Sequence, residues 1–276
     1  MDFDVSRVSV LALRWLLVAC IFVLLIYQER HRVTWPSLGR EVVVVVAAYF
    51  LYFAVRGLTE GGMAAATRHA WDIVELERRG GLLVEADLQS HIIGHPWLVD
   101  LVNWVYIWGH WPVIAVTAIW LFLRRRSMYG NIRDAFLISG GIGLIIFALY
   151  PVAPPRLIDV GLVDTVTLHS QAYRALQPTQ LTNQYAAFPS LHFGWNLLIG
   201  LAIFLSTEHW LARGFGLALP VFMFLAVVLS GNHFIIDAIA GGALALAAFA
   251  IVLWRQGRQS SAPDAFEHPS PKQATP

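Results

Sequence analysis

Long apolar runs separated by short polar segments dominate this chain of 276 residues. A helix that crosses a bilayer needs about 20 apolar residues, because the hydrocarbon core is about 30 Å thick. Backbone N–H and C=O groups have no water partners in lipid, so such runs form helices rather than open strands. The pattern therefore predicts an all-α membrane bundle of about seven transmembrane helices, at Val8–Tyr27, Val42–Val55, Trp97–Leu123, Ala135–Tyr150, Leu191–Ser206, Phe215–Leu229 and His233–Trp254.

Residues 57–96 have a different pattern, in which charged and apolar positions alternate with helical spacing. Gly80-Gly81 divides the segment, so we predict two amphipathic helices that lie on the membrane surface. They could form a lid over a site, although packing against the bundle is the simpler interpretation. The predicted organisation is an N-terminal membrane and interfacial part (1–96), a core (97–256) and a disordered tail rich in Pro and Ser (257–276).

Composition supports an integral membrane protein. Hydrophobic residues make up 57% of the chain and charged residues only 13%, whereas soluble domains carry about 25% charged residues. A net charge of +1 gives no reason to expect nucleic acid as a partner. The sequence has no glycine-rich loop of the kind that binds nucleotide phosphates, and its histidines and cysteine do not have the spacing of a metal site. We therefore expect no cofactor.

Arginines gather in alternate loops of the predicted bundle. With seven helices these loops share one side, which the positive-inside rule makes cytoplasmic. The C-terminus then lies in the cytoplasm of a plasma membrane or its equivalent, and residues 57–96, 151–190 and 230–232 lie on the other side. The loop arginines are Arg30, Arg32, Arg40, Arg124, Arg125, Arg126, Arg133, Arg213, Arg255 and Arg258.

Polar residues at the membrane boundary suggest chemistry on that outer side. His233 and Asp237 are four residues apart at a helix start and share a face, so the carboxylate can fix the imidazole tautomer and leave the other nitrogen as a nucleophile. A structural His–Asp pair that ties the helix end is the alternative.

A second imidazole, His192, follows the helix cap expected at Ser190. The N–H groups of that first turn can hold an anion, and His192 can give a proton to a leaving oxygen. Arg156, which follows two prolines, has a guanidinium suited to phosphate oxygens. The alternatives are a capped helix with a satisfied histidine, and an arginine that contacts lipid headgroups.

Further polar residues could line a pocket for a lipid headgroup. Asn103, Tyr106 and His110 fall on roughly one face of the predicted third helix, together with Asp100. Others flank the two histidine motifs. These candidates are Asn183, Gln184, Tyr185 and Asn232.

Taken together, Arg156, Pro189-Ser190-Leu191-His192 and His233 with Asp237 resemble the type 2 phosphatidic acid phosphatase superfamily. Phe188–His192 and Asn232–Asp237 are most similar to its inositol phosphorylceramide synthase branch. The resemblance implies a six-helix core in which His233 attacks phosphorus to form a phospho-histidine. It also implies that Asp237 orients His233, that His192 protonates the leaving group, and that Ser190 and Arg156 hold the phosphate.

The chain departs from the phosphatase members of this family at two cationic positions. No lysine precedes Arg156, and Val227 stands where those members have an arginine, six residues before the nucleophile. A site with few cations favours a phosphodiester, which brings one negative charge, over a monoester, which brings nearly two.

We therefore expect a phosphotransferase that acts on membrane lipid phosphate esters, with a possible alcohol acceptor. A lipid or polyprenyl (di)phosphate phosphatase is the first alternative, and a lipid-binding or lipid-moving protein without catalysis is the second.

Overall fold

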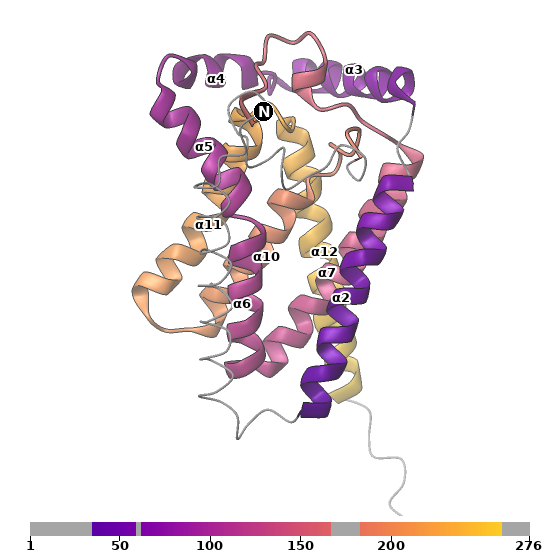
Figure 1. The fold of residues 1–276 in the computed structure, drawn as a ribbon, viewed down its shortest axis with the longest axis vertical. Helices are drawn as coiled ribbons and strands as arrows, with labels where there is room; N and C mark the ends of the chain where they lie inside the picture. The colour runs from indigo at the N-terminus through magenta and orange to yellow at the C-terminus, as the bar shows by residue number, and fades with distance from the viewer. Residues whose placement is uncertain (1–34, 59–61, 167–182, 261–276) are drawn as a thin grey trace, which may run out of the picture.

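The computed structural model describes residues 35–58, 62–166 and 183–260, which contain α-helices and no strand. The predicted all-α class is thus confirmed. Long helices run side by side, while α3 and α4 lie across one end of the bundle (Figure 1). The elements are α2 (Trp35–Leu58), α3 (Met63–Gly80), α4 (Glu85–Ile93), α5 (Pro96–Trp108), α6 (Trp111–Arg124), α7 (Arg126–Leu149), the short 3-10 helix η1 (Pro155–Leu157), α10 (Leu191–Ser206), α11 (Trp210–Leu229) and α12 (Ile235–Ser260).

Within these residues, α7, α11 and α12 are long and apolar enough to cross a membrane, and α5 with α6 gives a fourth span if the bent pair crosses once. Val8–Tyr27, the first predicted span, lies outside the described residues. The predicted count of about seven is not reached here, in part because α10 has only 16 residues. Ten of these are buried, so α10 is a central helix packed by its neighbours rather than by lipid.

The predicted single helix Trp97–Leu123 is wrong in one respect, because it is two helices that meet at 43°. The chain leaves the helical conformation at His110, with φ −96° and ψ −92°. Pro112 follows in the first turn of α6, where a residue without an N–H costs no hydrogen bond. The bend places His110 inside the bundle with a relative exposure of 2%.

Several helices extend further than the apolar runs that predicted them. α2 is longer than Val42–Val55 at both ends, α7 starts before Ala135, and α12 continues beyond Gly257 to Ser260. At the end of the bundle away from α3 and α4, polar contacts hold the start of α2, the start of α7 and the end of α12: Arg133 bonds Glu41 at 2.7 Å, and Gln256 donates to Asn131. Charged residues thus ended the predicted helices too early.

Two glycines set the distance between α10 and α12. A Cβ atom at Gly194 would overlap the carbonyl oxygen of Gly241, and one at Gly241 would overlap the carbonyl oxygen of Ser190. Small residues allow helix backbones to approach this closely. The first turns of α10 and α12 therefore lie together, and the backbone N–H of Ser190 donates to the carbonyl of Asp237 at 2.9 Å.

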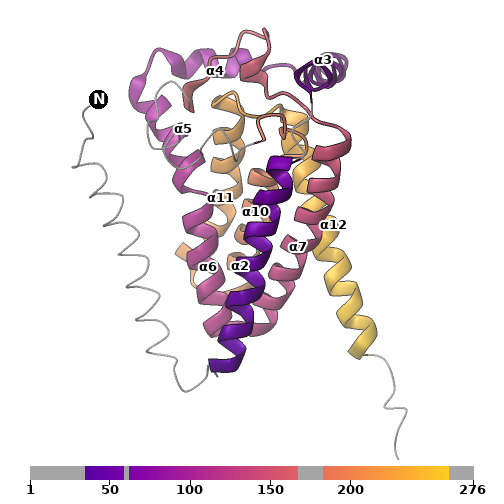
Figure 2. The ribbon, with the colours of Figure 1, turned by 45° about the vertical axis from the view of Figure 1, so that its right-hand side comes forward.

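The surface helices α3 and α4 carry out the packing role that the sequence suggested for residues 57–96. Ala153 N donates to the carbonyl of Ala66 in α3 at 3.1 Å. On α4, the buried amide of Gln89 donates to the carbonyls of Val163 and Leu229 at 2.8 and 2.9 Å. These contacts join loops far apart in the sequence at one end of the bundle, where Figure 2 shows α3 and α4 above the long helices.

Candidate active site

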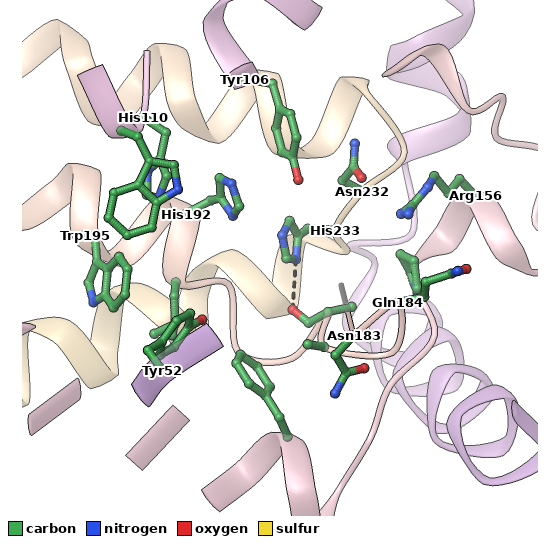
Figure 3. A pocket seen from close by; sticks show the side chains of 16 residues that line it. Tyr52, Tyr106, His110, Arg156, Asn183, Gln184, His192, Trp195, Asn232 and His233 are labelled. Atoms are coloured by element: carbon green, nitrogen blue, oxygen red, sulfur yellow. Dashed lines mark hydrogen bonds between the residues drawn. The ribbon is translucent and has the colours of Figure 1, made fainter. Parts of the chain in front are cut away.

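A polar pocket of about 50 Å³ opens beneath the surface helices. Its walls come from α2, the α5–α6 bend, the end of α7, η1, the first turn of α10 and the loops before η1, α10 and α12. Figure 3 shows the side chains directed toward this space from separate segments. The labelled residues are Tyr52, Tyr106, His110, Arg156, Asn183, Gln184, His192, Trp195, Asn232 and His233.

His233 lines the pocket just before α12 begins. Its backbone N–H donates to the carbonyl of Val227 at 3.1 Å, which holds the residue against the end of α11. Its ring atom Nδ1 lies 2.8 Å from the carbonyl oxygen of Ala187 and 3.4 Å from Oδ2 of Asp237. A proton on Nδ1 would satisfy that carbonyl, so this geometry favours Nε2 as the nucleophilic atom on the pocket side.

Asp237 is fully buried next to this imidazole. Its Oδ2 accepts a hydrogen bond from the backbone N–H of Phe234 at 2.8 Å, as a carboxylate does at a helix N-terminus. Asp237 therefore acts on the helix start as well as on His233, and the closest contact of Nδ1 is with the Ala187 carbonyl.

His192 projects into the same pocket from the first turn of α10. Its ring centroid lies 6.1 Å from that of His233, with 48° between the ring planes. It stacks on Tyr106 at 4.8 Å and on His110 at 4.2 Å. Asn196 links this group, because its Nδ2 lies 2.7 Å from Nδ1 of His110 and 2.8 Å from the carbonyl oxygen of His192. The two imidazoles thus occupy one small space, as Figure 3 shows.

Ser190 lies behind the pocket and does not line it. The residue is fully buried, and its Oγ caps α10 by accepting a hydrogen bond from Phe193 N at 3.4 Å. The predicted cap is therefore present, while the hydroxyl lies in the wall.

Arg156 reaches the pocket from η1, and Figure 3 shows its guanidinium directed toward the side of His233. Its Nε donates to Oδ2 of Asp164 at 3.1 Å. Its backbone N–H donates to the carbonyl of Gly231 at 2.9 Å. This contact explains a glycine with φ +73°, since a Cβ there would crowd Val163 and Arg156. The guanidinium thus faces the pocket with part of its charge balanced by Asp164.

The predicted headgroup residues divide into two groups. Tyr106, His110, Asn183, Gln184 and Asn232 line the pocket, and Figure 3 shows the Tyr106 hydroxyl directed toward His233.

Asn103 and Tyr185 do not line it. The Asn103 amide exchanges hydrogen bonds of 2.9 Å with the carbonyl and hydroxyl of Thr165, so it ties a loop to α5. The backbone of Tyr185 pairs with Val152 at 2.7 Å.

Sequence reasoning missed the aromatic wall formed by Tyr52, Trp111 and Trp195. Trp195 follows His192 by three residues, so helical spacing could have placed it on the same face. Tyr52 and Trp111 had no such signal. The Ala187 carbonyl was also missed, because a backbone acceptor has no signature in the sequence.

A comparison with protein families finds one match. The family model described as the PAP2 superfamily matches residues 71–251, from within α3 to within α12. No curated protein and no solved structure matches the chain. The chain belongs to the PAP2 superfamily and is an enzyme of the lipid phosphatase type.

Proposed function

We propose that this protein is a membrane phosphotransferase of the inositol phosphorylceramide synthase-like branch, acting on a lipid phosphodiester through a phospho-histidine at His233. The observation that carries the proposal is the pair of imidazoles, with ring centroids 6.1 Å apart, in one pocket whose described lining residues include a single arginine. A phosphorus atom between the rings would have a nucleophile on one side and a proton donor on the other.

In the first step, Nε2 of His233 attacks phosphorus and the bond to the leaving oxygen breaks. His192 gives its proton to that oxygen, while Ala187 and Asp237 hold the His233 ring from behind. Arg156 binds the phosphate oxygens that carry the developing charge. Ser190 supports this site by fixing the first turn of α10, from which His192 projects into the pocket.

In the second step, an acceptor hydroxyl attacks phosphorus, the bond from phosphorus to Nε2 of His233 breaks, and His192 takes the proton of the hydroxyl. Water in place of the alcohol would make the protein a phosphatase. Tyr106, Asn183, Gln184 and Asn232 offer hydrogen-bonding groups suited to a polyol beside the phosphate. A lipid-moving protein without catalysis is a weaker fit, since these polar side chains gather at one end of the bundle.

The charge of the pocket supports a diester donor. Of the described residues that line it, Arg156 is the single arginine, and the only lysine in the sequence is Lys272. Asp164 balances part of the Arg156 charge. Val227, at the position of the missing cation, is fully buried in an apolar cluster. One negative charge is therefore matched better than two.

An apolar cavity next to the site supports a lipid substrate. Its volume is about 280 Å³, and its walls come from α2, α6, α7 and α10. Tyr52, Trp111 and Trp195 line both this cavity and the polar pocket. An aliphatic chain in the larger cavity would thus lie next to a phosphate held by Arg156. Gly141 leaves open space in its wall.

We place the active site on the non-cytoplasmic face. Arg124, Arg125 and Arg126 join α6 to α7 at the end away from the pocket, and Arg125 Nε bonds the last residue of α10, Ser206, at 2.9 Å. Positive residues remain in the cytoplasm, so the opposite end, with its histidines, faces outward.

The proposal is tested with purified protein and two lipids. We expect exchange of labelled inositol into phosphatidylinositol, and slower release of phosphate from phosphatidic acid. His233→Ala should abolish both activities. His209→Ala is the matched control, because His209 is exposed at the other end of the bundle. Rapid phosphate release without exchange would replace the transferase by the phosphatase, and no reaction of either lipid would overturn both.

A further inference from the structure

The N-terminus of α12 is bound by carboxyl groups from three different helices. Three consecutive backbone N–H groups each have their own acceptor. Phe234 N donates to Asp237 Oδ2 at 2.8 Å, Ile235 N to Glu85 Oε1 at 3.1 Å, and Ile236 N to Glu77 Oε1 at 2.9 Å. The first N–H groups of a helix lack partners within it, so these contacts satisfy the helix start directly after His233.

Glu77 and Glu85 meet because the chain reverses between α3 and α4. Gly81 ends α3 in the left-handed conformation with φ +67°, where glycine is favoured. The N–H of Leu82 then donates to the carbonyl of Glu77 at 2.8 Å. Glu77 stands near the end of α3 and Glu85 is the first residue of α4, so the turn brings both side chains to α12.

Both side chains are removed from solvent, with relative exposures of 0% for Glu77 and 1% for Glu85. Burial and the neighbouring carboxyl group of Glu85 raise the pKa of Glu77 to about 9. Two adjacent buried carboxylates would repel each other, so a proton shared by the pair keeps one negative charge. That charge lies at the positive end of the α12 dipole.

We propose that Glu77 and Glu85 are positioning residues for His233. They fix the first turn of α12 and supply a negative charge behind the nucleophile. The imidazole ring becomes positive when Nε2 binds phosphorus and Nδ1 keeps its proton, so this charge stabilises the phospho-histidine. The inference rests on the proposed function and adds two residues of the surface helices to it.

The contacts at the start of α12 suggest variants that separate the loss of an acceptor from the loss of charge. Alanine at either position removes one acceptor from α12. A single glutamine keeps the acceptor oxygen, and its amide can donate to the remaining carboxylate, so one negative charge persists. The double variant Glu77→Gln/Glu85→Gln keeps the acceptors and loses the charge. Glu75→Ala is the matched control, since Glu75 in α3 is partly exposed and pairs with Arg78 and Arg79.

Two measurements test the inference on the full chain. The first is inositol exchange with phosphatidylinositol. We expect either alanine variant to lower kcat about 100-fold, as small misplacements of a catalytic group do, with KM unchanged. Each single glutamine should keep wild-type kcat, and the double variant should lower it about tenfold, the effect of about 1.4 kcal/mol.

The second measurement does not need turnover. Carbethoxylation of His233 by diethyl pyrocarbonate, followed by mass spectrometry from pH 5 to 9, gives the pH midpoint at which the ring becomes reactive. The double glutamine variant should move this midpoint to lower pH, because the protonated ring has lost a favourable charge. The single glutamine variants and Glu75→Ala should leave it in place.

Wild-type kcat in the alanine variants, or an unchanged midpoint in the double variant, would overturn the inference. The glutamine variants preserve size and acceptors, so they carry the test if an alanine variant does not fold. A wild-type protein that transfers no phosphoryl group would refute the proposed function, while the labelling of His233 would still test the pair.

Discussion

Nδ1 of His233 lies closer to the carbonyl oxygen of Ala187, at 2.8 Å, than to the carboxylate of Asp237, at 3.4 Å. The same Asp237 oxygen accepts the N–H of Phe234. A backbone acceptor therefore holds the ring, and the carboxylate adds charge and a helix cap. Because the two groups have different roles, removal of the Asp237 carboxylate should lower kcat less than it would if the carboxylate alone held the ring.

Asp237→Asn should lower kcat by about 10- to 100-fold. In a catalytic triad whose carboxylate alone fixes the histidine tautomer, replacement of the carboxylate by an amide lowers kcat about 10⁴-fold. Here the Ala187 carbonyl still selects the Nδ1–H tautomer, so the remaining loss comes from the missing charge. Single-turnover formation of the phospho-enzyme measures the effect, with the exposed Asp100→Asn as the control. A loss above about 10⁴-fold would show that Ala187 does not hold the tautomer.

His192→Ala should slow reactions in proportion to how poor the leaving group is. A general acid contributes about 10²–10⁴-fold when the departing oxygen needs a proton. Alkyl leaving groups, as in lipids, should lose this factor, while a nitrophenyl ester should lose little because its phenolate departs unprotonated. Equal losses for both classes would assign His192 to binding.

Glu77→Gln should reduce the pH dependence of stability. The pKa of Glu77 in the folded protein is about 9, above its ordinary value near 4.5, because the site is buried and Glu85 and Asp237 face it. The folded protein therefore holds a proton that the unfolded chain releases. Its stabilising effect is complete below pH 4.5 and is lost as the pH rises to about 9. The Tm of the variant should fall less between these values, and an identical slope would contradict the prediction.

Gly141→Leu should act on long-chain substrates. Gly141 lines the apolar cavity, and a Cβ atom added there would meet no protein atom within 4 Å, so a leucine has room at the cavity wall. We expect about a tenfold fall in kcat/KM for a long-chain lipid, equal to about 1.4 kcal/mol of lost chain burial, and little change for a short-chain analogue. Gly130→Leu on the same helix, with open space and outside the cavity, is the control. Equal effects on the long-chain and short-chain substrates would show that the lipid chain does not bind in this cavity.

Gly241→Ala should separate the two imidazoles. Its Cβ would overlap the carbonyl oxygen of Ser190, so α10 and α12 must move apart at a cost of about 1–3 kcal/mol. Both Tm and kcat should fall. Gly257→Ala, in open space on the same helix, should leave both unchanged. A stable, fully active Gly241→Ala protein would contradict the close packing.

The candidate site could be predicted from residues whose side chains have well-understood chemistry. His192, His233 and Arg156 carry groups suited to phosphoryl transfer, and their motifs predicted the family that the family model matches. The helical secondary structure was predicted from the apolar runs. The bend at His110 was not predicted, because glycine and proline, here Gly109 and Pro112, also occur within continuous membrane helices.

Other features of the site depended on three-dimensional packing. Glu77 and Glu85 lie in the segment predicted as two amphipathic surface helices, and only the turn at Gly81 buries them at α12. Tyr52 and Trp111 resembled the aromatic residues of a membrane interface. Asn103 had the polar character of a pocket residue, but Thr165 satisfies its amide.

The ion pair between Arg156 and Asp164 has a consequence for inhibition by inorganic phosphate. Inorganic phosphate carries more negative charge near neutral pH than a diester does, and the paired guanidinium offers it less than one full positive charge. Free phosphate should therefore leave the pocket readily and compete weakly with lipid. An enzyme of this kind would keep working in a phosphate-rich surrounding that slows relatives with additional cations.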